Sequence, residues 1–162
     1  MKAAFVSENG RVLERLKDEF DLIISDRDVL NQVCEDKFLN LEHDEDRILE
    51  VLDSKGVSTA ISLGYRRLFS PGFLEQVECE MYNMHPSILP AFKGLDVYCR
   101  VIERGVDVSG ATLHRIESEM DEGEIIDQIS YRVRDDMEVE ELKDYAADYE
   151  AKLVKSNIEA LM

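Results

Sequence analysis

Short apolar runs alternate with segments of helical periodicity through the first half of the chain, and this order constrains the fold more than any other feature. Residues 2–6, 21–25 and 58–63 read as short buried strands. Between them, residues 12–20 and 44–55 carry apolar positions at helical spacing, and the second segment ends at a glycine. The alternation predicts a doubly wound α/β fold with a parallel sheet, in which ligands bind beyond the carboxyl ends of the strands.

The second half of the chain follows a different pattern. Residues 111–117 and 125–133 alternate apolar and polar positions, which predicts two strands paired antiparallel. A helix is expected over 95–104, closed by Gly105, and a long amphipathic helix over 139–161. Weaker signals predict a strand over 38–41, a short helix with Pro71 in its first turn over 70–77, a turn over 7–10, and either a short helix or irregular structure over 28–35.

Composition limits the classes of function. A chain of 162 residues with 44% apolar content fits one domain, residues 1–162. The net charge of −17 argues against nonspecific nucleic-acid binding and against anionic membrane surfaces. The apolar runs are too short for a signal peptide or a spanning helix. Cys34, Cys79 and Cys99 lack metal-ligand spacing, which predicts no metal site and reduced thiols in a cytoplasmic protein.

The run from Asn83 to Gly94 (NMHPSILPAFKG) contains the main chemical candidates. If residues 80–84 form a strand, Asn83 and His85 leave it on the same side. Pro86 has no N–H for the sheet, so the strand is expected to end where this polar pair begins. An amide donor beside an imidazole suits a carbonyl that becomes an oxyanion. The alternative is a pair of polar residues at the start of a loop, without chemistry.

Two further motifs follow in order, Gly110-Ala111-Thr112-Leu113-His114 and Asp121-Glu122-Gly123-Glu124-Ile125-Ile126-Asp127-Gln128. With the first run, they resemble the folate-dependent formyltransferases, most closely those that act on glycinamide ribonucleotide in purine synthesis. The resemblance is specific from about residue 61 to residue 130. It implies a Rossmann-like formyltransferase fold, with a mostly parallel twisted sheet, helices on both faces and an antiparallel C-terminal part.

The resemblance also assigns roles to the polar residues. Formyl transfer passes through a tetrahedral species with negative charge on oxygen, so it needs oxyanion donors and a path for a proton. By resemblance, Asn83 and His85 are the donors, while Asp121 orients His85, raises its pKa and helps to remove the amine proton. Spacing alone does not separate Asp121 from Glu119 or Glu122, and an Asx-type turn is an alternative for it.

Other positions are expected to surround this centre. His114 and Ser87 are expected to support the reacting groups from behind, although a strand histidine is by itself more often structural. The run Leu63-Gly64-Tyr65-Arg66-Arg67-Leu68-Phe69-Ser70 resembles the family's folate pocket, which implies donor contacts from Arg67, Leu68 and Phe69. The loop of residues 116–121, with Ile116 and Met120, would lie over the pterin. Without the resemblance, Arg66 and Arg67 read as a solvated basic pair.

The acceptor side departs from the family pattern. A glycine-rich loop normally holds the substrate phosphate with backbone N–H groups, whereas this chain has Ser7-Glu8-Asn9-Gly10-Arg11. Gly10 and Arg11 are the remaining candidates for phosphate contact, and Glu8 adds a negative charge. The segment between Ser25 and Asp44 is shorter than in the family. Glu150 matches the family's acceptor-ribose glutamate or belongs to a solvated helix face. The resemblance also implies a cis Leu89–Pro90 bond, whereas without it an ordinary trans turn is the default.

These features predict a cytoplasmic enzyme that takes a formyl group from 10-formyltetrahydrofolate, without a metal. Its partner is a small amine acceptor, glycinamide ribonucleotide by resemblance. The altered acceptor side leaves open a formyltetrahydrofolate hydrolase or an amino-sugar N-formyltransferase with the same three residues. A protein of another class, a non-catalytic folate-binding or scaffold protein, also stays open. The choice between folate and a modified pterin is open too, as is the oligomeric state, with a homodimer among the options.

Overall fold

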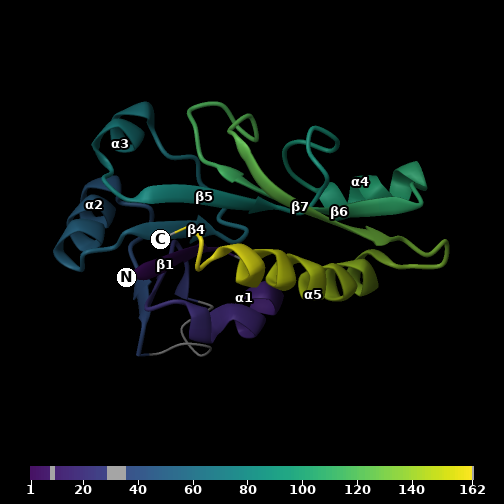
Figure 1. Cartoon of the computed structure of the whole chain (residues 1–162), viewed down its shortest axis with the longest axis horizontal. Helices are drawn as coiled ribbons and strands as arrows, with labels where there is room; N and C mark the ends of the chain where they lie inside the picture. The colour runs from purple at the N-terminus through teal and green to yellow at the C-terminus, as the bar shows by residue number, and fades with distance from the viewer. Residues whose placement is uncertain (8–9, 29–35, 162) are drawn as a thin grey trace.

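The sheet has the predicted doubly wound organisation. The computed structural model describes residues 1–7, 10–28 and 36–161, which contain a seven-stranded sheet of order β3-β2-β1-β4-β5-β6-β7 (Figure 1). Neighbouring strands from β3 to β5 pair parallel, and β6 and β7 add antiparallel. The strands are β1 (Lys2–Val6), β2 (Leu22–Ser25), β3 (Phe38–Asn40), β4 (Thr59–Ser62), β5 (Glu80–His85), β6 (Val108–Arg115) and β7 (Ile125–Arg132).

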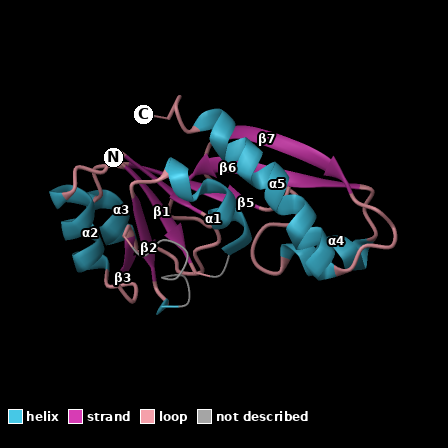
Figure 2. Cartoon of the chain, turned by 90° about the horizontal axis from the view of Figure 1, so that it is seen from below, coloured by secondary structure: helices cyan, strands magenta, loops and turns pink. Residues whose placement is uncertain are grey.

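Helices cover both faces of the sheet, as predicted. Successive residues of a strand point to opposite faces, so Ala4 and Val6 pack in one core with α1 and α5, while Ala3 and Phe5 pack in another with α2 and α3 (Figures 1 and 2). A third apolar cluster joins α4, α5 and β7. The helices are α1 (Gly10–Leu16), followed by a 3-10 turn (Lys17–Glu19), α2 (Glu45–Ser54), α3 (Pro71–Gln76), α4 (Val97–Arg104) and α5 (Val139–Asn157).

Several element boundaries differ from the sequence-based expectation. β5 continues through His85, so the Asn83–His85 pair lies within the last residues of the strand rather than beyond it. The reason given for the end is right, since β5 stops directly before Pro86, which cannot extend the ladder. Gly10 opens α1 instead of closing a turn, and α5 ends at Asn157. Glu8, Asn9 and residues 29–35, on which two weak predictions fell, lie outside the described residues.

Local signals explain where the helices start and stop. Asp44 accepts a hydrogen bond from the backbone N–H of Arg47 at the start of α2, and Ser70 accepts one from Phe73 at the start of α3. Gly105 ends α4 with a left-handed backbone, φ 61°, which glycine adopts without a steric penalty. No helix in the described part of the chain is long and apolar enough to cross a membrane.

Gly110 in β6 sits where a side chain has no room. A Cβ at this position would overlap the backbone carbonyl of Ile129 on β7 and lie 2.8 Å from a side-chain carbon of Ile88. We expect Gly110→Ala to lower the free energy of unfolding by on the order of 3 kcal/mol, measured by urea denaturation, because the paired strands must separate. Gly72→Ala is the control, since a Cβ in α3 meets only Ser70 Oγ at 3.9 Å. Equal stability of the two variants would contradict this account.

Candidate active site

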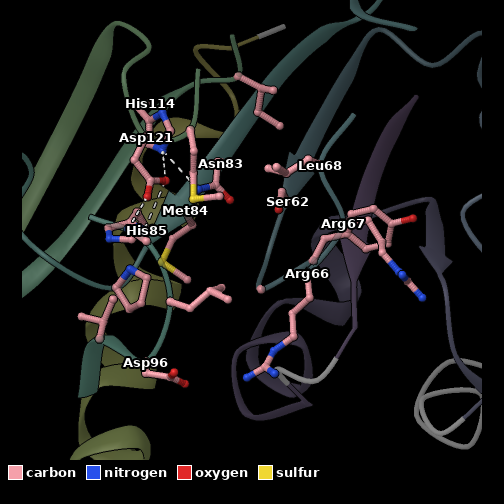
Figure 3. Close-up of a pocket in the computed structure, with 18 of the residues that line it drawn as sticks. Ser62, Arg66, Arg67, Leu68, Asn83, Met84, His85, Asp96, His114 and Asp121 are labelled. Atoms are coloured by element: carbon pink, nitrogen blue, oxygen red, sulfur yellow. Dashed lines mark hydrogen bonds and ion pairs between the residues drawn. The ribbon is translucent and has the colours of Figure 1, made fainter. Parts of the chain in front are cut away.

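A cleft of about 530 Å³ opens beyond the carboxyl ends of β4 and β5. This is the edge where the strand order reverses, since β1 has β2 on one side and β4 on the other. In Figure 3, Asn83, His85, His114 and Asp121 gather on one wall, and Arg66 and Arg67 lie across from them. The cleft is therefore bounded by the polar cluster on one side and by the segment after β4 on the other.

The end of β5 and the adjacent strand β6 bring the polar side chains together. Asn83 and His85 are two residues apart and share one face of β5. In the antiparallel register, Asn83 lies opposite His114 and His85 lies opposite Thr112. Asn83 and His114, which are 31 positions apart in the chain, therefore become direct neighbours across two strands.

Hydrogen bonds fix the orientation of the Asn83 amide. His114 Nδ1 lies 2.8 Å from the carbonyl oxygen of Arg115, which can only accept, so Nδ1 carries the hydrogen in the neutral ring. His114 Nε2 is then an acceptor, and Asn83 Nδ2 donates to it at 3.1 Å. An amide nitrogen has two hydrogens, so Asn83 can hold His114 and still donate to an oxygen bound in the cleft.

His85 is held between a carbonyl group and a carboxylate. Its Nε2 lies 2.9 Å from the carbonyl oxygen of Phe92, so Nε2 is the donor. Its Nδ1 faces Asp121 Oδ1 at 3.4 Å, and both side chains are only 6% exposed. In the neutral ring, Nδ1 is therefore the nitrogen that can accept a proton, and Asp121 is placed to stabilise the imidazolium that results.

Asp121 reaches the cluster from the turn before β7. Its backbone is left-handed, with φ 57°, a conformation that aspartate tolerates better than most residues. Oδ2 accepts the backbone N–H of Gly94 at 2.8 Å, and Oδ1 lies 3.7 Å from His114 Nε2. Glu122, its neighbour, instead pairs with Lys93 at the surface. The structure thus brings Asp121, and not Glu122, to the histidines.

Burial and charge act in opposite directions on this pair. Burial is the largest influence on the pKa of His85 and lowers it, as His114 and Arg100 also do, while the Phe92 carbonyl and the Asp121 carboxylate raise it; the net shift is downward. Asp121 does raise the pKa of His85, as expected, but the net shift of that pKa is downward and not upward. Burial raises the pKa of Asp121, but His114, the Gly94 N–H and His85 together lower it. Asp121 is thus ionised and His85 neutral near pH 7.

The downward shift at His85 predicts a loss of stability in mild acid. Between the ordinary pKa of about 6.5 and the lower folded pKa, the unfolded chain binds a proton at this position that the folded chain does not. Stability should therefore decrease as the pH falls below about 6.5. We expect the free energy of unfolding to drop less between pH 7.5 and 5.5 in His85→Asn than in the wild type, measured by urea denaturation. An unchanged pH dependence would contradict the shift.

All five residues expected to contact the folate donor line the cleft, but they differ in how exposed their side chains are. Leu68 and Met120 are exposed, and Ile116 is partly buried. Phe69 also borders the cleft, but its ring packs inward against Phe73 with centroids 4.5 Å apart. Phe69 therefore belongs to the core beneath the pocket as well as to the cleft wall.

Arg67, whose side chain is about half exposed, forms an ion pair with the buried carboxylate of Asp26. Its Nε lies 2.8 Å from Asp26 Oδ2, and the Asp26 side chain is 1% exposed. Ser7, at the end of β1, donates to Asp26 Oδ1 at 2.6 Å and accepts the backbone N–H of Arg66 at 3.0 Å. Burial raises the pKa of Asp26, but Ser7 and Arg67 together lower it. A negative charge thus lies beside the start of the segment expected to hold phosphate.

The expected acceptor residues do not gather at one place in the cleft. Arg11 borders the cleft with Tyr98 and Lys143, but its guanidinium pairs with Glu140 and Asp144 on α5. Gly10 lies in the first turn of α1 and is not part of the cleft wall.

Glu150 and Ser87 lie in the interior. Glu150 is fully buried and accepts a hydrogen bond from Tyr98, so the solvated helix face considered from sequence is wrong. Ser87 is buried behind the cleft, where it donates to the carbonyl of Ala91. The Leu89–Pro90 bond is cis, as expected.

Sequence reasoning missed the backbone groups that hold the cluster. The carbonyl of Phe92 and the N–H of Gly94 contact His85 and Asp121, respectively. Both residues belong to the motif that begins at Asn83, but a backbone contact leaves no signature in residue type. Arg100, which donates to the Phe92 carbonyl, was also missed, because one arginine on an amphipathic helix reads as a surface charge.

The fold and the site define a class: an α/β protein with a doubly wound sheet and a polar cluster at the carboxyl edge of its strands. Residues 4–158 match the formyl transferase family, and the chain belongs to that family.

Relatives within the family carry two different activities in their names. A formyltetrahydrofolate deformylase of Mycobacterium tuberculosis is 42% identical over 106 residues, which cover 65% of this chain and 34% of that protein. The deformylase of Bacillus subtilis is 31% identical over 156 residues, which cover 94% of this chain and 48% of that protein. The chain thus spans a third to a half of the length of these relatives.

A solved structure is similar over nearly the whole chain. The crystal structure of glycinamide ribonucleotide transformylase 1 from Symbiobacterium toebii has a TM-score of 0.84 at 26% identity, and the match covers 97% of this chain and 84% of that protein's chain.

Proposed function

We propose that this protein takes the formyl group from 10-formyltetrahydrofolate and delivers it to a small amine, with glycinamide ribonucleotide as the acceptor. The observation that carries the proposal is the convergence of Asn83, His85 and Asp121 at one wall of a 530 Å³ cleft. The segment after β4 lines this cleft, and so do Arg11, Tyr98 and Lys143. Donor and acceptor could thus meet at the polar cluster.

Each side chain of the cluster has a role in the proposed reaction. The acceptor amine attacks the formyl carbon, and the N–H of Asn83 stabilises the negative charge that develops on oxygen. His85 Nδ1 takes the proton that the amine loses, and Asp121 stabilises the resulting imidazolium. The imidazolium then returns a proton to the folate nitrogen as the carbon–nitrogen bond breaks. His114 keeps the Asn83 amide oriented throughout.

Positive side chains support a phosphorylated acceptor. Arg11 and Lys143 both line the cleft. The guanidinium of Arg11 is already paired with two carboxylates, so a phosphate would have to share or displace them. Among the described residues, Lys143 forms an ion pair only with Glu140, three positions earlier on the same helix. These groups can attract a phosphate by charge, although they do not replace the backbone N–H groups of a glycine-rich loop.

Hydrolysis of 10-formyltetrahydrofolate is the second candidate, with water as the acceptor. It is favoured by Asp26, whose ionised carboxylate lies beside Ser7 and opposes an anion there. The two deformylase relatives support the same alternative. The same cluster could serve both reactions, because His85 can take a proton from water as well as from an amine.

The two candidates are separated by measuring release of tetrahydrofolate from 10-formyltetrahydrofolate. Release that requires glycinamide ribonucleotide, with one formylated product per folate, supports the transferase. Equal release without any amine supports the hydrolase, and release only with an amino sugar assigns another acceptor. Binding of the folate by calorimetry without turnover under any of these conditions would contradict both candidates and leave a non-catalytic folate-binding protein.

A further inference from the structure

The segment Phe92–Gly94 contacts both members of the imidazole–carboxylate pair. The carbonyl of Phe92 accepts from His85 Nε2 at 2.9 Å, and the N–H of Gly94 donates to Asp121 Oδ2 at 2.8 Å. These two backbone groups determine which nitrogen of His85 faces Asp121 and where the carboxylate lies. A shift of this segment would therefore move both side chains at once.

This segment has a backbone conformation that needs support. Phe92 has φ 54° and Gly94 has φ 81°, so two of its three residues are in the left-handed region. For phenylalanine this region is unfavourable, and the conformation persists only where surrounding contacts hold it. Lys93 supplies one contact through an ion pair with Glu122, but both of these side chains are substantially exposed, and exposed pairs contribute little.

Arg100 of α4 supplies the other contacts. Its Nη2 lies 3.0 Å from the carbonyl oxygen of Phe92 and 2.6 Å from that of Lys93. Its guanidinium carbon also lies 5.8 Å from the centre of the Phe92 ring, within the range of a cation–π contact. Both hydrogen bonds are partly buried, where charge-assisted bonds are stronger than at the surface.

We propose that Arg100 is a positioning residue for the proposed reaction: it holds the Phe92–Gly94 segment and, through it, the His85 ring and the Asp121 carboxylate. The kinetic test of this inference rests on the proposed function, whereas the NMR test does not. Arg100 does not touch the reacting atoms in this account. It acts through the carbonyl that it shares with His85 Nε2.

The charge of Arg100 also bears on His85. The groups that act on the His85 ring are Asp121 from the turn before β7, His114 from β6 and Arg100 from α4, in addition to the Phe92 carbonyl. Asp121 raises the pKa of His85, whereas His114 and Arg100 lower it. Loss of the Arg100 charge should therefore raise the pKa of His85, an effect that a purely structural contact far from the ring would not have.

The first test measures titration of His85 by NMR in the wild type, Arg100→Met and Arg100→Lys. The chain has three histidines, so His43→Asn and His114→Asn variants assign the signals. We expect a higher His85 pKa in Arg100→Met and a value closer to the wild type in Arg100→Lys, which keeps the charge. Arg104→Met, an exposed arginine on the same helix, is the matched control and should leave the titration unchanged.

The second test measures kinetics with the acceptor that the turnover assay identifies. We expect Arg100→Met to lower kcat about 10- to 100-fold through misplacement of the reacting groups, with little change in the KM for the folate. Partial recovery in Arg100→Lys and wild-type rates in Arg104→Met would support the proposal. A wild-type kcat in Arg100→Met would overturn it.

The two readouts keep this inference separate from the proposed function. If the wild type shows no turnover, the proposed function fails, and the NMR titration still decides whether Arg100 acts on His85. If kcat falls while the titration of His85 matches the wild type, Arg100 contributes only to general stability and the inference is wrong. Thermal denaturation of each variant identifies loss of the fold.

Discussion

Asn83→Ala is expected to lower kcat for formyl transfer roughly 100- to 1000-fold, which is the usual effect of removing one oxyanion donor. The amide of Asn83 is held by His114 at 3.1 Å, so its direction is set before any substrate binds. The KM for 10-formyltetrahydrofolate should change little, because the donor contact strengthens mainly as charge develops on oxygen. Steady-state kinetics of the purified variant measures both quantities.

The control for this prediction is Asn157→Ala. Asn157 bonds to Asp127 and to the Leu153 carbonyl at the end of α5, away from the cleft. We expect its kcat to match the wild type. If Asn83→Ala keeps the wild-type kcat and the wild-type thermal stability, Asn83 is not an oxyanion donor, and the polar pair at the end of β5 has only a structural role.

Asp121→Asn should lower kcat about 100- to 10,000-fold, the range expected when a proton-transfer pathway is lost. Asparagine tolerates the left-handed backbone at this position, so the variant removes charge with little added strain. Because Asp121 raises the pKa of His85, its loss should lower that pKa further. The acid limb of the pH–rate profile should therefore move to lower pH in the variant, and a full pH–rate profile measures this shift.

Glu119→Gln and Glu122→Gln are the matched controls for Asp121→Asn. All three substitutions remove one negative charge from the same turn, but among the described residues only the Asp121 carboxylate lies within 4 Å of His85 and His114. Glu122 pairs with Lys93 instead. Both controls should keep kcat close to the wild type. A similar loss of activity in all three variants would indicate that the total negative charge of the turn matters, rather than the position of the Asp121 carboxylate.

The α/β class could be predicted because local patterns and the fold agree in the first half of the chain. Fully buried parallel strands need short continuous apolar runs, and residues 2–6 and 58–63 have them. Caps such as Ser70 and Gly105 mark helix ends by chemistry that acts within one turn. The predicted end of β5 is too early, because the pattern could not show that Asn83 still pairs with β4 and β6 and that His85 still pairs with β6.

Only part of the candidate site could be predicted from the sequence. The two-residue spacing of Asn83 and His85 places them on one face of a strand, which is a local property. The choice of Asp121 over Glu119 and Glu122 came from family resemblance, because three acidic residues in one turn look alike in sequence. The structure separates them by direction: Asp121 points toward two histidines, and Glu122 points toward Lys93.

Taken alone, the sequence determined the order of strands and helices, the family resemblance and the residue types of the cluster, since these follow from periodicity and local motifs. The tertiary structure decided which partners those residues have: the Phe92 carbonyl for His85, the Gly94 N–H for Asp121, and Arg100 behind both. It also decided that Glu150 is buried. The physical reason is that these contacts join backbone groups and elements distant in the chain, and only packing brings them within hydrogen-bonding distance.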